Sequence, residues 1–196
     1  MRNQMNVIAL NGSPNKDGNT YRLIKYTLAE IEKAGIRTEI IQIGGKKVHP
    51  CIACWKCFEN QDKKCVQDKD MVNESIEKMI SADAIIIATP TYFAGVTPEI
   101  KAFMDRAFFV AKANGDLFRR KIGAGIAAER RAGAVCAVDT INHYFGISGM
   151  FTAGSRYWNL GIGLKPGDVV NDDEGIDTMK QLGENIAWFI KKTHKK

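Results

Sequence analysis

Four of the five cysteines lie close together, and their spacing is CxxCxxC followed by seven residues and one more cysteine. The four are Cys51, Cys54, Cys57 and Cys65. Thiolates repeated at every third residue can surround one compact inorganic core, as they do in bacterial ferredoxins, whereas zinc sites usually separate two CxxC pairs by a longer span. The spacing therefore favours a [4Fe-4S] cluster. A structural zinc site and a loop that carries no metal remain the alternatives.

A second group of residues follows an apolar run at positions 6–10. Positions 11–20 read NGSPNKDGNT and precede a predicted helix, so backbone amides and the helix dipole can surround an anion there. The stretch lacks the Gly-Lys-Ser/Thr of a P-loop and the third glycine of GxGxxG, which argues against a nucleoside triphosphatase and an NAD site. We predict a monophosphate site; a capped helix after a simple turn is the alternative. Its candidate residues are Ser13, Asn15, Gly18, Asn19 and Thr20.

A third group follows the apolar run at positions 84–88. The stretch 89–95 reads TPTYFAG, and an aromatic pair beside a glycine can lie against a flat ligand. A turn whose Tyr-Phe pair fills the core is the alternative. The candidate residues are Pro90, Thr91, Tyr92, Phe93, Ala94 and Gly95.

These groups need a scaffold, and the hydrophobic pattern predicts one. Short apolar runs indicate buried strands at 6–10, 36–43, 84–88, 122–128 and 150–153, and apolar residues at helical spacing fall between several of them and after residue 174. Alternating strands and helices predict an α/β fold with a five-stranded parallel sheet in the order 2-1-3-4-5. We expect one domain over 1–196, with a cysteine-rich loop insertion at 44–70. Cys136 is expected to pack in the interior.

The charge and hydropathy of the chain exclude several functional classes. Its net charge is +6, but four lysines in the last six residues supply much of it, so we expect no nucleic-acid binding. No apolar run reaches the roughly 18 residues of a membrane-spanning helix, and the N-terminal run is short for a signal peptide. We therefore expect no membrane partner and a cytoplasmic location.

Three stretches together resemble the flavodoxin-like NADPH-dependent FMN reductase superfamily: 11–20, 89–106 and 157–168. The resemblance implies a flavodoxin-like three-layer fold that binds FMN. It implies that the five candidate residues of the stretch 11–20 hold the phosphate, that residues 90–95 lie near the isoalloxazine ring, and that the loop 128–133 closes over the pyrimidine edge. Glu129 and Arg130 are the candidate contacts in that loop.

Within this superfamily the cysteine arrangement resembles the iron-sulfur flavoproteins. That resemblance implies an FMN-dependent oxidoreductase that moves electrons between FMN and a [4Fe-4S] cluster. The expected donor is ferredoxin-like or NAD(P)H, the acceptor is a small molecule, and the assembly is a homodimer or homotetramer. No catalytic side chain is expected, because the cofactors carry the reactive atoms. An NAD(P)H-dependent FMN or quinone reductase without a cluster and a non-enzymatic flavodoxin-type electron carrier are the alternatives.

Overall fold

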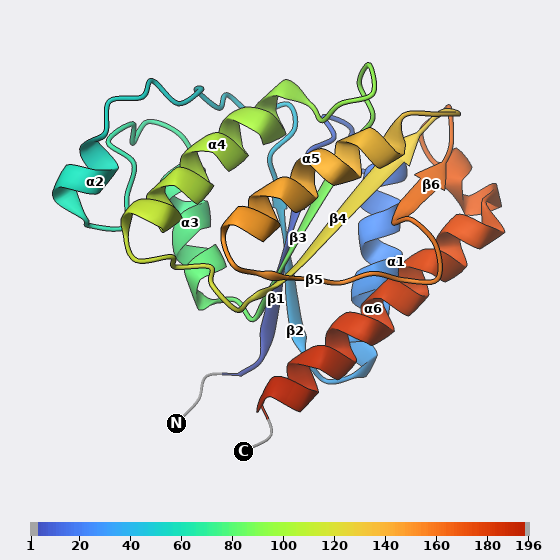
Figure 1. The fold of residues 1–196 in the computed structure, drawn as a ribbon. Helices are drawn as coiled ribbons and strands as arrows, with labels where there is room; N and C mark the ends of the chain where they lie inside the picture. The colour runs from blue at the N-terminus through green and yellow to red at the C-terminus, as the bar shows by residue number, and fades with distance from the viewer. Residues whose placement is uncertain (1–3, 195–196) are drawn as a thin grey trace.

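One parallel sheet with helices on both faces organises the computed structural model, which describes residues 4–194 (Figure 1). The strands are β1 (Asn6–Asn11), β2 (Arg37–Gln42), β3 (Ala84–Pro90), β4 (Ile122–Glu129), β5 (Phe151–Thr152) and β6 (Leu160–Ile162). The helices are α1 (Asn19–Lys33), α2 (Lys56–Asn60), α3 (Val72–Ser81), α4 (Pro98–Ala113), α5 (Ala134–Ile147) and α6 (Asp173–His194), with a short 3-10 helix, η1 (Asp168–Asn171).

The strand order is β2-β1-β3-β4-β5 with every pair parallel, which confirms the predicted topology. The edge beside β4 holds two short strands rather than one. β5 pairs with the beginning of β4, and β6, which the sequence analysis did not predict, pairs with its end, Ala127–Glu129. A strand of three residues is too short to show an alternating pattern, so β6 left no signal in the sequence.

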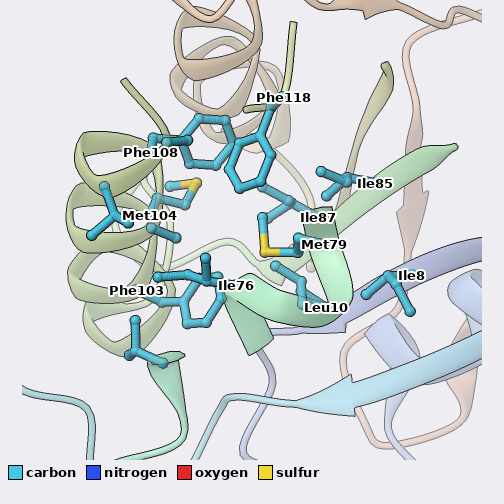
Figure 2. Close-up of a cluster of buried hydrophobic side chains, with 14 of the residues drawn as sticks. Ile8, Leu10, Ile76, Met79, Ile85, Ile87, Phe103, Met104, Phe108 and Phe118 are labelled. Carbon is cyan, nitrogen blue, oxygen red and sulfur yellow. The ribbon is translucent and has the colours of Figure 1, made fainter. Parts of the chain in front are cut away.

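Side chains of the central strands alternate between two hydrophobic cores. Ile8 and Ile85 belong to the core under α3, α4 and α5, part of which Figure 2 shows. Val7 and Ile86 belong to the core under α1 and α6. Both faces of β1 and β3 are buried, which explains why these strands read as continuous apolar runs.

Two helices were not predicted, α2 and α5. The start of α5 follows Gly133, whose φ of +100° is a left-handed conformation that glycine adopts at little cost. Its buried residues do form a helical stripe, but the exposed apolar residues Cys136 and Ile147 lie off that stripe and obscured the helical period. Cys136 is also exposed on α5, so the expectation that it packs in the interior is wrong.

The segment 44–70, here called the cysteine segment, connects β2 to α3. Its one regular element is the single short helix α2, and Figure 1 shows it extending beside α4 at one end of the molecule. Within residues 4–194 no helix is both long and apolar enough to span a bilayer.

Candidate functional site

A cavity of about 210 Å³ opens at the carboxyl ends of β1, β3 and β4, the place where open parallel sheets bind ligands. We call it the first cavity. Its lining includes all the predicted phosphate and ring residues except Phe93, Ala94 and Gly95, and it also includes Glu129 and Arg130. Ala128, Gly163, Leu164 and Pro166 complete the wall. The last three follow β6, so the loop after that unpredicted strand is the part of the cavity that sequence reasoning missed.

The phosphate end of the first cavity is formed by the anion loop, residues 12–18, and the start of α1. Among the described residues no side chain caps this helix, and its first turn carries no acidic residue. The first amides of α1 are therefore free to bind an anion, which the helix dipole also favours. A Cβ atom added at Gly18 would lie 2.9 Å from the Cβ of Asn15, so the tight loop requires glycine at this position.

Gln42, at the end of β2, holds the anion loop in place. Its Nε2 donates hydrogen bonds to the carbonyl oxygens of Ser13, at 2.6 Å, and Gly44, at 2.8 Å. Its Oε1 accepts a hydrogen bond from Nδ2 of Asn11 at 2.8 Å. The backbone of the anion loop is thus preorganised before any ligand binds. A polar residue at a strand end is common, so this partner could not be singled out from the sequence.

Asn19 lines the first cavity, but its side-chain amide is already engaged. Its Oδ1 accepts hydrogen bonds from the amides of Gly167, at 2.9 Å, and Val169, at 3.2 Å. Its Nδ2 donates to the carbonyl oxygen of Lys165 at 3.0 Å. Asn19 thus fixes the loop after β6 against α1 and so shapes the cavity wall.

Beyond β3 the chain makes a tight turn at the rim of the first cavity. The amide and carbonyl groups of Tyr92 and Gly95 pair with each other at 2.9 and 3.0 Å. The two residues between them, Phe93 and Ala94, have φ values of 49° and 60°. Left-handed conformations of non-glycine residues cost free energy and concentrate at functional sites. Phe93 is fully exposed, which explains why it does not line the cavity.

Thr91 supplies an unmet hydrogen-bonding group in the wall of the first cavity. Its amide donates to the carbonyl oxygen of Ala128 at 2.8 Å, which fixes the residue between β3 and β4. Its hydroxyl oxygen is buried and has no hydrogen-bond partner in the described part of the chain. A buried polar atom without a partner is rare and costly, so this hydroxyl, on a residue that lines the cavity, is a candidate partner for a ligand. The residues present therefore fit a bound cofactor.

Glu129 ends β4 at the same cavity and is nearly buried, with 8% of its surface exposed. Its Oε2 accepts a hydrogen bond from the amide of Ala134 at 2.8 Å. Because Ala134 begins α5, the carboxylate lies at the positive end of a helix, where its charge is stabilised. Glu129 thereby fixes the loop 130–133, and Arg130 in that loop is exposed to solvent.

All four clustered cysteines line a second, smaller cavity against α4, here called the cysteine cavity. Cys57 is buried, Cys65 is half-buried, and Cys51 and Cys54 are exposed. Between residues 4 and 194 no three ligand side chains converge tightly enough for one metal ion. A tetrahedral zinc site needs every sulfur about 2.3 Å from one point, whereas a [4Fe-4S] cluster binds each thiolate through a different iron. Four thiols that line one cavity are a donor set of the kind and number that a cluster uses.

The backbone around these cysteines curls into left-handed conformations at alternate residues. Ala53 has φ 51° and Trp55 has φ 60°, and the amide of Ala53 points to the sulfur of Cys51 at 3.5 Å. Amide groups directed at sulfur are typical of cluster sites. Burial raises the pKa of the Cys57 thiol, so a bound cation would be needed to hold it as thiolate at neutral pH.

Helix α4 connects the two cavities. Near its beginning, the hydroxyl of Thr97 donates a hydrogen bond to the carbonyl oxygen of Gly12 in the anion loop at 3.0 Å. Farther along, Arg106, Phe109 and Val110 line the cysteine cavity. With a rise of about 1.5 Å per residue, Thr97 and Arg106 are separated by roughly 14 Å along the helix. One rigid element thus sets the relative position of both candidate sites.

Comparison with known proteins identifies the family. The family model described as NADPH-dependent FMN reductase matches residues 5–165. The chain belongs to this family. An iron-sulfur flavoprotein of Methanocaldococcus jannaschii is 36% identical over 95% of this chain and 98% of its own length. An iron-sulfur flavoprotein of Methanosarcina thermophila is 31% identical over 93% of this chain and 94% of its own length.

A solved structure of a flavodoxin, a WrbA-like protein from Agrobacterium tumefaciens, superimposes with a TM-score of 0.67 at 15% identity. The superposition covers 98% of this chain and all of that one. This likeness confirms the flavodoxin-like fold. Membership of the family confirms that the protein is an FMN-dependent oxidoreductase.

Proposed function

We propose that the protein transfers electrons between FMN in the first cavity and a [4Fe-4S] cluster held by Cys51, Cys54, Cys57 and Cys65. The observation that carries this proposal is that all four thiols line one cavity on α4, the helix whose other end supports the anion loop. The iron-sulfur flavoproteins among the relatives, which match nearly the whole chain, support the same assignment.

In this proposal the side chains bind and orient the cofactors, and no residue acts as an acid, base or nucleophile. The free amides of α1 bind the phosphate, and Thr91 donates or accepts a hydrogen bond in the cavity wall. Glu129 and Gln42 hold the two loops that shape the cavity. When bound, FMN exchanges electrons in pairs or singly and the cluster exchanges them singly, so together they connect pair and single-electron chemistry.

The partners follow from that chemistry. We propose a ferredoxin-like protein or NAD(P)H as the electron donor and a small molecule as the acceptor. We also propose a homodimer or homotetramer in the cytoplasm. These assignments rest on the resemblance to iron-sulfur flavoproteins.

The second candidate is an NAD(P)H-dependent FMN or quinone reductase in which the cysteine segment carries no cluster. Two observations favour it: the description of the matching family, and the lack of tight convergence of the thiols within residues 4–194. In this case FMN alone would accept electrons as a pair, and the exposed cysteines would serve no redox purpose.

Stoichiometric reduction under anaerobic conditions separates the two candidates. With FMN and a cluster the purified protein takes up about three electrons per chain, whereas FMN alone takes up about two. The first result, with a cluster EPR signal that a Cys57→Ser variant lacks, supports the proposal. Uptake of two electrons by iron-free protein that oxidises NAD(P)H would assign the second function instead.

A further inference from the structure

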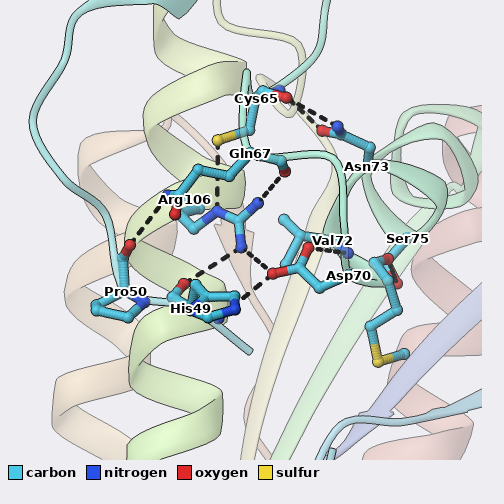
Figure 3. A network of polar contacts seen from close by, with 10 residues as sticks. His49, Pro50, Cys65, Gln67, Asp70, Val72, Asn73, Ser75 and Arg106 are labelled. Atoms are coloured by element: carbon cyan, nitrogen blue, oxygen red, sulfur yellow. Dashed lines mark hydrogen bonds and ion pairs between the residues drawn. The ribbon is translucent and has the colours of Figure 1, made fainter. Parts of the chain in front are cut away.

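Arg106 is the largest fully buried side chain among the described residues. It lies on α4 and points into the cysteine segment, as Figure 3 shows. Its Nε donates to the sulfur of Cys65 at 3.4 Å. One terminal nitrogen donates to the carbonyl oxygen of His49 at 3.2 Å and to the carboxylate of Asp70, and the other donates to the carbonyl oxygen of Gln67 at 2.5 Å.

We propose that Arg106 is a positioning residue for the fourth cysteine ligand. It fixes the Cys65 sulfur at the wall of the cysteine cavity, and its N–H···S hydrogen bond raises the reduction potential of the cluster. The effect on the potential rests on the proposed function, whereas the anchoring of the cysteine segment does not.

The anchoring is visible in the contacts around Cys65. Asn73 holds its backbone, because its Oδ1 accepts from the Cys65 amide and its Nδ2 donates to the Cys65 carbonyl oxygen, both at 2.8 Å. Arg106 holds its sulfur. The Asp70 side chain is 2% exposed and also accepts from the amides of Val72, at 3.2 Å, and His49, at 3.3 Å. Protein groups therefore hold both the backbone and the sulfur of Cys65.

Arginine is the side chain that this arrangement requires. Its planar fork carries five N–H donors, and here they reach acceptors at four different positions of the cysteine segment. Lysine has the same charge but a compact ammonium group, which cannot match acceptors spread over that width. A buried ion pair is weak evidence for added stability, so its value here is to fix one arrangement of the segment.

The direction of the effect on the potential follows from charge. Reduction adds an electron to the cluster and its thiolates, and N–H donors to sulfur stabilise that more negative state. Because the Arg106 side chain is fully buried, its donors face little competition from water. Loss of the Nε–H donor therefore lowers the reduction potential.

Three variants test the proposal. Arg106→Lys keeps the positive charge but removes the planar guanidinium group with its five N–H donors. The double variant Arg106→Met/Asp70→Leu removes both members of the ion pair, so no buried charge is left alone. Lys112→Met is the control, because it removes a positive charge from the same helix at an exposed ion pair with Asp116, which lies outside the cysteine segment. FMN binding reports that each variant is folded.

Two readouts are measured, the midpoint potential of the cluster by EPR-monitored titration and the resistance of bound iron to a chelator. We expect both Arg106 variants to have a lower midpoint potential and to lose iron at about tenfold lower chelator concentration. An effect of this size is usual when a residue that hydrogen-bonds to a metal ligand is replaced. The control should match the natural protein. Unchanged potential and iron retention in the folded double variant would overturn the proposal.

A third readout uses protein without iron. Limited proteolysis should cut the cysteine segment faster in both Arg106 variants than in the natural protein or the control. If the natural protein binds no iron, the proposed function fails, but this digestion still decides whether Arg106 anchors the segment. Equal cleavage rates in all four proteins would refute the anchoring.

Discussion

Replacing Thr91 by valine should change the stability of the FMN-free protein and its affinity for FMN in opposite directions. Valine keeps the branched shape and removes the hydroxyl, which is buried without a partner in the wall of the first cavity. A buried polar group that lacks a hydrogen bond costs roughly 1–3 kcal/mol. We therefore expect the FMN-free variant to be more stable, by about 1 kcal/mol.

FMN binding should weaken in the same variant, because the ligand loses one hydrogen bond. A neutral hydrogen bond contributes about 1 kcal/mol net, which corresponds to about a fivefold higher Kd. Urea unfolding of the FMN-free protein and quenching of FMN fluorescence measure the two quantities. Both changes are small, so they must be measured in the same buffer and at the same temperature.

Thr89→Val is the matched control. The Thr89 hydroxyl is two residues away and is fully paired, since it donates to the carbonyl oxygen of Pro90 at 2.8 Å and accepts from the amide of Thr97 at 3.1 Å. Its loss should destabilise the FMN-free protein by about 1 kcal/mol. If Thr91→Val destabilises the protein as Thr89→Val does, or leaves the Kd for FMN unchanged, the assignment of the unpaired hydroxyl to a ligand is refuted.

Three further predictions concern the cysteines, the anion loop and acid stability. Cys54→Ser should abolish iron incorporation and spare FMN, whereas Cys136→Ser should keep both; parallel loss of iron and FMN in the first variant would contradict two separate sites. Gly44→Ala would place a Cβ 2.3 Å from the backbone of the anion loop, so the Kd of this variant for FMN should rise at least about tenfold in a fluorescence titration. Gly154→Ala is the control, because open space surrounds this glycine, and it should bind FMN as the natural protein does. Burial alone would raise the pKa of Asp70, but hydrogen bonds from its arginine partner and from two amides outweigh this and lower it. The ionised carboxylate therefore adds stability that is complete above about pH 4 and is lost as the pH falls through the lowered pKa. The variant Arg106→Met/Asp70→Leu lacks this carboxylate, so its midpoint of urea unfolding should fall less steeply on acidification than that of the natural protein.

The sheet and the first cavity were predictable because their signals are local. β1 and β3 are apolar on both faces, and the anion loop directly follows β1, so the run 6–10 with the next ten residues indicated both strand and site. The four cysteines could likewise be recognised as a candidate cluster site from their spacing along the chain alone. Each of these features depends on residues that are neighbours along the chain.

The missed features depend on residues that are distant along the chain. Arg106 is 57 positions from His49 and 36 from Asp70, and Gln42 is 29 from Ser13. Nothing near Arg106 in the sequence shows that its side chain is buried among carbonyl oxygens and a thiol. Asn19 lines the cavity, but its hydrogen bonds to the loop after β6 join positions that are far apart along the chain and could not be seen in the sequence.

The central claim is that one chain carries both cofactors, and chemical analysis of anaerobically purified protein tests it most directly. FMN, iron and acid-labile sulfide are measured per chain in the same sample. We predict about one FMN with about four irons and four sulfides. A colourless protein that does not bind added FMN, or an FMN-containing protein free of iron and sulfide, would contradict the account.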